Sequence, residues 1–326
     1  MFSKLNNKNT LLWSRIGSRA TFGLLALELG KNIDDIMILT SDVSTSAGLD
    51  RFRKTYSDKF LEIGIAEQNL IGIAAGLASE NYKVITTTFA PFQTMRCCEQ
   101  IKVNLGYMKQ KVCMIGLASG LNLGTLGYTH CSIEDLSVMR SIPNITVISP
   151  ADCGETVKAI CSSLKHNESV YIRLTGGANN PIVYSDDYNF EIGKSIKLKK
   201  GNDITIFSTG TMVYESLQAA NNLDKEGISA SVINVHTLKP FDNEIIEEMS
   251  NKSKLFVTVE EHNVIGGLSS VIAEAKSELI NSPPQLSIGI PDQYSEGGEY
   301  QYLKNKYGLN STNIAERIIK QYHNLG

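Results

Sequence analysis

The sequence contains no apolar run near the roughly 20 residues that a membrane-spanning helix requires. Its amino-terminal segment, MFSKLNNKNTLLWSR, has no apolar core followed by a small-residue cleavage site, so we expect no signal peptide. Basic residues are not in excess, because 31 Lys and Arg stand against 34 Asp and Glu, a net charge of −3. We therefore expect a globular protein whose partners include neither a membrane nor a nucleic acid. Its 326 residues are enough for two domains.

Cysteine pairs of the metal-binding or redox kind are also missing. None of the 6 cysteines forms a CxxC pair or stands at zinc-ligand spacing from a histidine, so we expect no metal ligands on this chain. Cys131 directly follows His130, but adjacent residues of an extended chain point to opposite sides, which disfavours a nucleophilic pair. Free, buried thiols in a reducing cytoplasm are the better interpretation.

Short apolar runs alternate with segments of helical periodicity along the first half of the chain. The runs are DIMILT (35–40), KVITTTF (83–89), KVCMIGLA (111–118), ITVISP (145–150) and SVYIRLT (169–175). Each is followed by a turn signal and then by a pattern with a period of about 3.6 residues. This alternation predicts a parallel sheet with helices on both faces.

A polar stretch rich in tyrosine and aspartate, residues 179–203, interrupts the alternation. A second set of apolar runs then follows, at 203–210, 229–242 and 254–262. The pattern predicts an α/β protein of two domains, 1–189 and 190–326, each a mainly parallel sheet flanked by helices.

The apolar, glycine-laced segment at 60–82 holds a carboxylate, Glu67, in its middle. Burial of a carboxylate is costly unless a partner pairs with it. Glu67 is either a first-turn helix residue favoured by the helix dipole or a residue with a chemical role. Gly72 and Gly76 are four residues apart beside several alanines, which would give a helix a face that another backbone can approach closely.

Two phenylalanines, Phe89 and Phe92, come directly after a predicted strand, where open α/β sheets place their ligands. They could form a wall for a flat ring, or they could simply belong to the core. His130 follows a loop with four glycines at 116–127, so it either faces a ligand and transfers protons or caps the next helix.

Two arginines stand apart from other charges. Arg173 ends an otherwise apolar strand, and Arg15 lies in the segment WSRIGSR. The planar guanidinium of arginine suits phosphate, whereas a buried ion pair with a protein carboxylate is the alternative for Arg173.

In their order and spacing these segments resemble the carboxyl-terminal half of transketolase, its pyrimidine-binding domain followed by its C-terminal domain. The resemblance covers nearly the whole chain and is strongest to split transketolases, whose two halves are separate chains. The segments that carry it are TSDVSTS (40–46), IGIAEQN (63–69), TTTFAPF (86–92), GYTH (127–130), SIPNITVISPAD (141–152), YIRL (171–174) and VTVEEHNVIGGL (257–268).

The resemblance implies a transferase that moves a two-carbon ketol unit from a ketose or ketose phosphate to an aldose, with thiamine diphosphate as cofactor. The family glutamate that matches Glu67 hydrogen-bonds to N1′ of the cofactor's aminopyrimidine. A desolvated carboxylate holds a proton more readily, so it can share one with the ring and activate it. His130 matches a histidine that touches the donor's hydroxyl oxygen. Glu67 and His130 are thus the expected catalytic residues.

The remaining expected site residues also come from the resemblance. In the family, the matching positions line the pyrimidine pocket, lie beside the cofactor or hold the sugar phosphate. The cofactor-binding positions are Asp42, Val43, Phe89, Phe92 and Met95, and the substrate-binding positions are Arg15, Ser46 and Arg173.

Three positions depart from the family pattern. Met95 replaces a third aromatic residue, and methionine can still pad a ring. Ala118 stands where transketolases carry a histidine that binds the substrate phosphate. Leu126 stands where they carry an aspartate that binds a sugar hydroxyl. Loss of a polar residue that hydrogen-bonds to the substrate shifts substrate specificity strongly. The identities of the ketose donor and the aldose acceptor therefore stay open at this point.

The chain lacks the GDG motif through which thiamine enzymes hold Mg²⁺ and the cofactor diphosphate. A highly charged ligand needs that metal cage. The resemblance therefore implies a separate partner chain that carries the diphosphate domain and the Mg²⁺ ligands, with the active site at the interface and an α2β2 assembly. We expect His262, in the C-terminal domain, to be structural.

Two other enzymes share this domain order, the β subunit of a 2-oxo-acid dehydrogenase and an enzyme like 1-deoxyxylulose-5-phosphate synthase. Arg15, Ser46 and Arg173 together with GYTH favour sugar chemistry over oxo-acid decarboxylation. A non-catalytic assembly subunit is a third alternative, and the intact set of catalytic residues argues against it.

Overall fold

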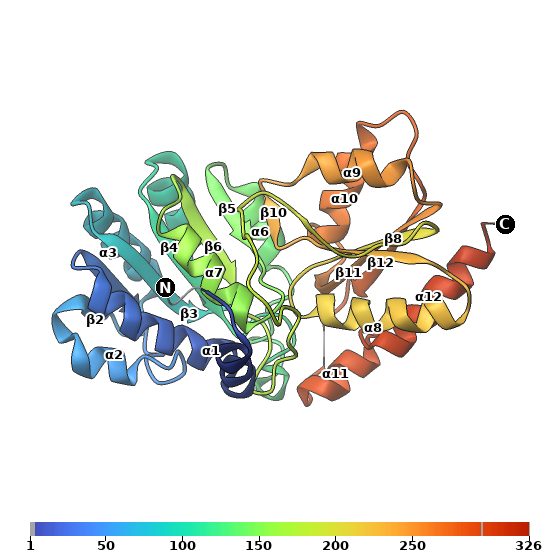
Figure 1. The fold of residues 1–326 in the computed structure, drawn as a ribbon. Coiled ribbons are helices and arrows are strands. Elements are labelled where there is room, and N and C mark those ends of the chain that lie inside the picture. Colours follow the sequence, from blue (N-terminus) through green and yellow to red (C-terminus); the bar gives the residue numbers. More distant parts are fainter. Residues whose placement is uncertain (1–3, 295, 326) are drawn as a thin grey trace.

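A computed structural model describes residues 4–294 and 296–325, so the first three residues of the amino-terminal segment lie outside the described part. The chain forms two α/β domains side by side, each with helices on both faces of a mainly parallel sheet, as the sequence predicts (Figure 1). The first sheet has seven strands in the order β10-β5-β6-β4-β3-β1-β2, and the second has five in the order β12-β11-β8-β9-β7.

The first domain contains the strands and helices up to residue 173. Its strands are β1 (Ile36–Thr40), β2 (Phe60–Glu62), β3 (Lys83–Phe89), β4 (Val112–Leu117), β5 (Ile145–Ile148) and β6 (Ser169–Arg173). Its helices are α1 (Asn7–Asn32), α2 (Asp50–Thr55), α3 (Glu67–Ser79), α4 (Ala90–Gln93), α5 (Cys98–Gln100), α6 (Asp135–Ser141) and α7 (Cys153–Ser163). Short helical turns connect them: η1 (Ser57–Lys59), η2 (Met95–Cys97), η3 (Ile101–Tyr107) and η4 (Gly124–Leu126).

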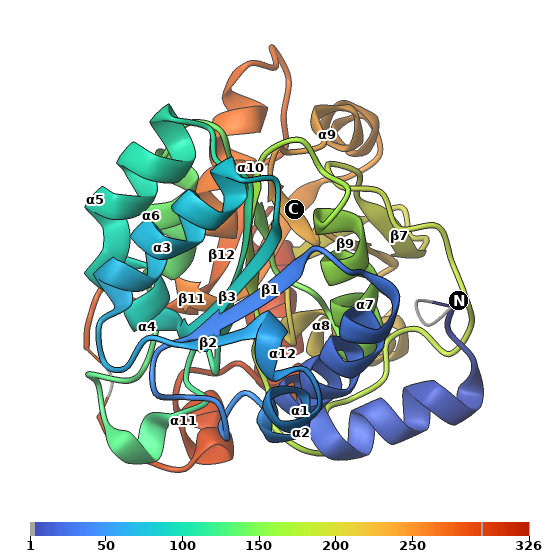
Figure 2. The ribbon, with the colours of Figure 1, turned by 90° about the vertical axis from the view of Figure 1, so that its left-hand side faces the viewer.

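The strands β1, β3, β4, β5 and β6 of the first sheet are buried on both faces. Successive side chains of a strand point to opposite faces, so each strand contributes to two cores. Ile36 and Ile38 of β1 join the core beneath α1 and α7, whereas Met37 and Leu39 join the core beneath α3 and α6. Figure 2 shows α1 and α7 on one side of β1 and β3, with α3, α5 and α6 on the other. Continuous apolar runs are what such a doubly covered parallel sheet requires.

The second domain follows the polar segment. Its strands are β7 (Ile196–Lys199), β8 (Ile204–Ser208), β9 (Ala230–Asn234), β11 (Leu255–Asn263) and β12 (Gln285–Ile290). Its helices are α8 (Met212–Lys225), α9 (Asn243–Ser250), α10 (Leu268–Ser277), α11 (Tyr300–Lys306) and α12 (Ser311–His323). Phe207 and Phe256 pack in the same core cluster as Leu136 of α6, so the hydrophobic core is continuous between the domains.

One strand crosses the expected division. β10 (Thr237–Lys239) comes from the second half of the chain but pairs antiparallel with β5 of the first sheet. The sequence predicted residues 229–242 as part of the second alternation, and it did not predict β2, β7 or β12. β2 has only 3 residues and β7 is antiparallel and only partly buried, so neither carries a strong apolar run.

α1 bends at Gly17, which has a left-handed φ of 82°. A Cβ added there would lie 2.5 Å from the carbonyl oxygen of Gly177, so only glycine permits this approach. Asn179 N–H donates to Arg15 O (3.3 Å) and Asn180 N–H donates to Ser14 O (3.0 Å). The bend therefore fixes the middle of α1 against the loop that follows β6.

His236 is fully buried after β9, with its ring stacked on Phe190 at 4.3 Å between centroids. Burial lowers the pKa of His236 from 6.5 to about 4, although Asp242 acts in the opposite direction. The unfolded chain therefore binds more protons between these pH values, and folding stability falls as pH falls from about 6.5 to 4.

We expect His236→Gln to reduce that acid-dependent loss of stability by on the order of 1–3 kcal/mol. Urea unfolding at a series of pH values in this window measures it. His323→Gln, which changes an exposed histidine near the end of α12, serves as the control and should leave the pH dependence as in the wild type. An unchanged slope in His236→Gln would show that His236 is not held neutral.

Candidate active site

The predicted site residues gather at the carboxyl edge of the first sheet. β2 and β3 flank β1 on opposite sides. The order of strands in the sheet therefore reverses at β1, which makes it a topological switch point. Open α/β sheets bind ligands at such a switch point, outside the carboxyl ends of the strands. Asp42 follows β1, Phe89 ends β3, and Ala118 follows β4, so the segments that carry the predicted site begin at this edge.

Glu67 is the first residue of α3, and its side chain is 4 % exposed. Gly64, with φ of 75°, turns the chain from β2 into this helix, and no side chain caps the first turn. A carboxylate at this position is favoured by the helix dipole. Its ion-pair partner is Arg96, whose Nη1 lies 2.7 Å from Oε1. Glu67 is thus the buried first-turn residue that the sequence described, and it points to the region where Arg96 lies.

Three aromatic rings cluster beside Glu67. The centroids of Phe89 and Phe92 are 6.3 Å apart, those of Phe92 and His130 are 5.3 Å apart, and those of Phe89 and His130 are 6.3 Å apart, all edge-to-face. The guanidinium carbon of Arg96 lies 3.9 Å from the Phe92 centroid. The loop that carries His130 thus brings the ring to the phenylalanines, and the three rings are partly exposed.

The segment after β1 contributes Asp42, Val43 and Ser46 to the same edge. Asp42 adopts a left-handed φ of 55°, and its N–H donates to Glu62 Oε1 at 2.7 Å. That backbone turn leaves the Asp42 side chain exposed, whereas Val43 is buried and Ser46 is half-buried. The segment thus presents a carboxylate and an apolar side chain next to one another.

Arg15 and Met95 are both exposed. Arg15 precedes the bend of α1 and makes no side-chain hydrogen bond or ion pair within residues 4–294 and 296–325, so its cation is available. Met95 lies in η2 next to Arg96 with 55 % of its surface exposed, so in this chain it faces outward.

Arg173 corrects one prediction. Its side chain is 1 % exposed, and its Nε donates to both oxygens of Asp135 at 2.9 and 3.1 Å. Nη2 donates to the carbonyls of Glu261 (2.8 Å) and Ser132 (3.1 Å), and Nη1 to Thr175 Oγ1 (3.3 Å). This is the buried ion pair that the sequence left open as the alternative, and it does not fit a phosphate site, so Arg173 leaves the proposed substrate set.

Several buried hydroxyl groups at this edge have no hydrogen-bond partner among the described residues. They belong to Thr40 and Ser41 at the end of β1 and to Thr87 and Thr88 near the end of β3. Buried polar atoms are nearly always paired in folded proteins. Unpaired hydroxyls on both sides of the switch point are therefore consistent with a polar ligand or ordered water there.

Cys97 and Cys131 are unsuited to act as nucleophiles at this site. Burial raises the pKa of the Cys97 thiol to about 12, and the charge of Glu67 acts in the same direction. Burial also raises the pKa of Cys131 to about 11, with Glu261 and Glu134 adding to the effect. Both thiols stay protonated at neutral pH. Four of the cysteines are free and buried, as expected, whereas Cys98 and Cys161 are free but only half-buried.

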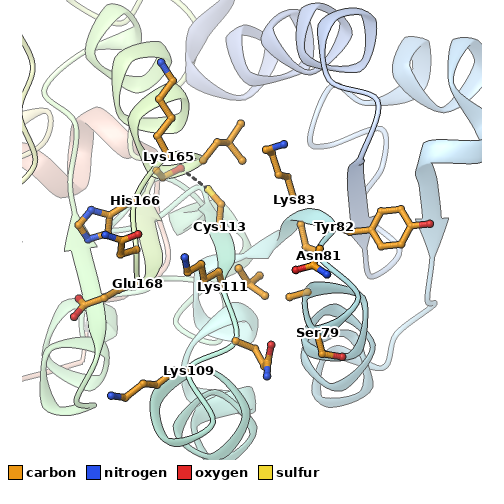
Figure 3. A pocket seen from close by; sticks show the side chains of 17 residues that line it. Ser79, Asn81, Tyr82, Lys83, Lys109, Lys111, Cys113, Lys165, His166 and Glu168 are labelled. Atoms are coloured by element: carbon orange, nitrogen blue, oxygen red, sulfur yellow. Dashed lines mark hydrogen bonds between the residues drawn. The ribbon is translucent and has the colours of Figure 1, made fainter.

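A cavity of about 470 Å³ lies at the opposite, amino-terminal edge of the sheet (Figure 3). Lys83, Lys109, Lys111 and Lys165 line it, and none of the predicted site residues does. α3 and α7 end at this edge, and a cation near a helix carboxyl end is favoured by the helix dipole. Lys165 follows the end of α7 and suits that complementarity, whereas Lys83 pairs with Asp35, and we place no reaction there.

Within residues 4–294 and 296–325 no three His, Cys, Asp or Glu side chains are grouped so that they could hold a metal ion. In the same part of the chain no helix combines the length and apolar character needed to cross a membrane.

The candidate site therefore combines a buried carboxylate at a helix start, two phenylalanine rings and a histidine at the switch point of the first sheet. Such a set suits a flat, nitrogen-containing ring that stacks and shares a proton. Comparison with known proteins shows the family to which this chain belongs. Residues 14–180 match the family model of the transketolase pyrimidine-binding domain, and residues 193–314 match that of the transketolase C-terminal domain. The chain belongs to the transketolase family.

Its relatives include separate transketolase subunits. It is 39 % identical over 308 residues to the 6-deoxy-6-sulfo-D-fructose transketolase subunit SqwH of Clostridium sp. (strain MSTE9), covering 94 % of this chain and 93 % of that one. It is 37 % identical over 306 residues to one subunit of the apulose-4-phosphate transketolase of Phocaeicola vulgatus, covering 94 % and 97 %. A solved structure, "Split gene transketolase, inactive beta4 tetramer", superposes with a TM-score of 0.84 at 36 % identity, covering 94 % and 97 %.

Sequence reasoning missed Arg96, which contacts both Glu67 and Phe92. Its position offered one signal. Arg96 follows Phe92 by four residues, a spacing that puts two side chains on one face of a helical turn. The family resemblance gave no role to this position, so the contact became visible only in the structure.

Proposed function

We propose that this chain is one half of a thiamine-diphosphate-dependent transketolase that transfers a two-carbon ketol unit from a ketose to an aldose. The observation that carries the proposal is the grouping of buried Glu67 with the rings of Phe92 and His130 at the switch point of the first sheet. In this proposal Glu67 and His130 are the catalytic residues.

Thiamine diphosphate would supply the carbon nucleophile and the electron sink. Phe89 and Phe92 would hold its aminopyrimidine by stacking, and Glu67 would hold a proton at the ring nitrogen N1′. Asp42, Val43 and Met95 complete the proposed cofactor contacts. His130 reaches the rings from the neighbouring loop and would hold the hydroxyl oxygen of the ketose.

The residues present fit the aminopyrimidine. A flat, hydrogen-bond-donating group, the guanidinium of Arg96, already rests on the Phe92 ring and donates to Glu67. The unpaired hydroxyls at the ends of β1 and β3 add polar atoms at the same edge. The fit does not extend to the diphosphate, because the chain has no GDG motif for Mg²⁺.

A separate partner chain would supply the diphosphate domain and the Mg²⁺ ligands. Large apolar side chains are exposed on the segments beside the proposed site, among them Ile65 (76 %) and Met95 (55 %). Gly72 and Gly76 of α3 are exposed, with open space where a Cβ would stand. A second chain could therefore approach closely here, and an α2β2 assembly in the cytoplasm is the arrangement that we propose.

The proposed substrates are a ketose or ketose phosphate and an aldose. Ala118 is 1 % exposed and Leu126 is 56 % exposed, and neither offers a polar side-chain atom. Among the predicted substrate residues, Arg15 and Ser46 are left to contact an anionic group, since Arg173 is paired with Asp135. We propose that the partner chain supplies the other polar residues that bind the substrate.

The test is to produce this chain together with a chain that carries the GDG-containing domain, add thiamine diphosphate and Mg²⁺, and screen ketose donors against aldose acceptors. Transfer of a two-carbon unit supports the proposal. Decarboxylation of a 2-oxo acid such as pyruvate, in place of ketol transfer, would support the alternative enzymes. A pair that binds no cofactor would support an assembly subunit.

A further inference from the structure

We propose that Arg96 is an internal stand-in for the cofactor's aminopyrimidine, which fills the subsite in the chain without cofactor and must leave it when the cofactor binds. The inference rests on the proposed function, because that proposal places the ring between Glu67 and the phenylalanines. It concerns a residue to which neither the family resemblance nor the relatives assign a role.

The first observation is the pair of contacts that the guanidinium makes. Nη1 donates to Glu67 Oε1 at 2.7 Å, and the guanidinium carbon lies 3.9 Å from the centroid of Phe92. An aminopyrimidine in the proposed pocket would stack on the same aromatic wall and hydrogen-bond to the same carboxylate. Both groups are flat and conjugated, and N1′ of the ring, when it holds the proton shared with Glu67, presents an in-plane N–H to the carboxylate as the guanidinium does. They compete for one carboxylate and one ring face.

The second observation concerns what Arg96 does for a chain without cofactor. Glu67 is 4 % exposed, and Arg96 is its ion-pair partner among the described residues. A buried carboxylate with no partner is strongly destabilising. Arg96 thus removes that penalty until the cofactor arrives.

The third observation is that Arg96 can move. Its side chain is 42 % exposed, whereas that of Glu67 is buried. Its backbone is held separately, because Gln68 Nε2 donates to the carbonyl of Arg96 at 3.1 Å. The side chain can therefore swing toward solvent while the turn η2 stays in place, which is what a displaceable occupant requires.

The consequence is a cost on cofactor binding. The cofactor must displace an ion pair and a cation–π contact before it reaches Glu67, so wild-type affinity is lower than the pocket allows. Removal of the guanidinium should tighten the binding of the ring by roughly tenfold, which corresponds to about 1.4 kcal/mol. The same change should lower the thermal stability of the chain without ligand.

The experiment uses the full chain and the bare ring, 4-amino-2-methylpyrimidine, as the probe, with affinity measured by ligand-observed NMR. Arg96→Met keeps the aliphatic stem and removes the guanidinium. Lys102→Met is the matched control for loss of a cation, because Lys102 lies at an exposed position of η3 and its ammonium makes no hydrogen bond or ion pair with the described residues. We expect Arg96→Met to bind the probe about tenfold more tightly than the wild type and to unfold at a lower temperature, and Lys102→Met to do neither.

Addition of Glu67→Gln to the Arg96→Met variant should abolish the gain, which places the probe at Glu67. If Arg96→Met binds the probe as weakly as the wild type or more weakly, the proposal that Arg96 occupies the subsite is wrong. Arg96 would then either have no effect on binding of the ring or contact the bound ring itself. In that case the proposed function survives, provided that binding still depends on Glu67. Binding of the probe by no variant contradicts both the stand-in and the proposed pyrimidine subsite.

Discussion

Replacement of Glu67 by glutamine should reduce two-carbon transfer by the assembled enzyme by a factor of about 10² to 10⁴, the usual range for loss of a positioned proton-transfer group. Glutamine keeps the size of the side chain and its carbonyl oxygen, but it cannot hold a proton at the ring nitrogen. The rate of transfer at saturating cofactor measures this effect, and cofactor affinity measured on the same sample separates binding from activation.

Glu80→Gln provides the matched control for the loss of a carboxylate. Glu80 lies at the other end of the same helix, is exposed and has no role in the proposed site. We expect its rate to equal that of the wild type. A Glu67→Gln enzyme with a full rate would show that the carboxylate serves only to stabilise the start of α3, which was the other interpretation of the sequence.

Asp135→Asn should produce the largest loss of stability. The carboxylate of Asp135 is fully buried, and it receives two hydrogen bonds from Arg173 Nε and a third from Tyr171 OH at 2.7 Å. Removal of one partner leaves a buried guanidinium without its counter-charge, which typically costs about 3–5 kcal/mol. Urea unfolding of the chain measures the change in the free energy of unfolding.

The control is Asp35→Asn, which breaks an ion pair of similar length at the surface. Lys83 lies 2.7 Å from Asp35, but both side chains are more than 40 % exposed, at 43 and 47 %. Exposed pairs contribute less than about 1 kcal/mol, so this variant should unfold almost as the wild type does. Equal effects of the two substitutions would contradict a stabilising role for the buried pair.

The Asp135 result also bears on the function of Arg173. The guanidinium contacts Glu261 O, so the pair joins the first sheet to β11 of the second domain. If Arg173 instead held a sugar phosphate, Asp135→Asn would change the Michaelis constant for phosphorylated substrates with little effect on unfolding. We expect instead that Asp135→Asn lowers the free energy of unfolding strongly and changes the Michaelis constant for phosphorylated substrates little.

The sequence predicted the fold well where strands are long and apolar. β1 and β3 coincide within one residue with the runs at 35–40 and 83–89, because strands covered on both faces leave a continuous apolar signal. β2 and β10 have three residues each, and their pairing depends on neighbours distant in the chain. No local pattern contains that information.

The same contrast holds for the candidate site. The resemblance pointed to Glu67, Phe92 and His130, and the structure brings them together. It placed Arg173 among the substrate-binding residues, whereas the structure pairs Arg173 with Asp135. The local sequence could not decide between the two, because an arginine at the end of a strand has the same sequence pattern with either partner. Arg96 was missed for a related reason: its partner is a buried carboxylate 29 residues away in sequence.

The most direct test of a shared active site is a titration of this chain into a fixed amount of a partner chain that carries the diphosphate domain, with thiamine diphosphate and Mg²⁺ present. We expect no ketol transfer by this chain alone, and a rate that rises in proportion to added chain and levels at equal amounts. Full activity of this chain without a partner would contradict the central claim that it supplies one half of the site.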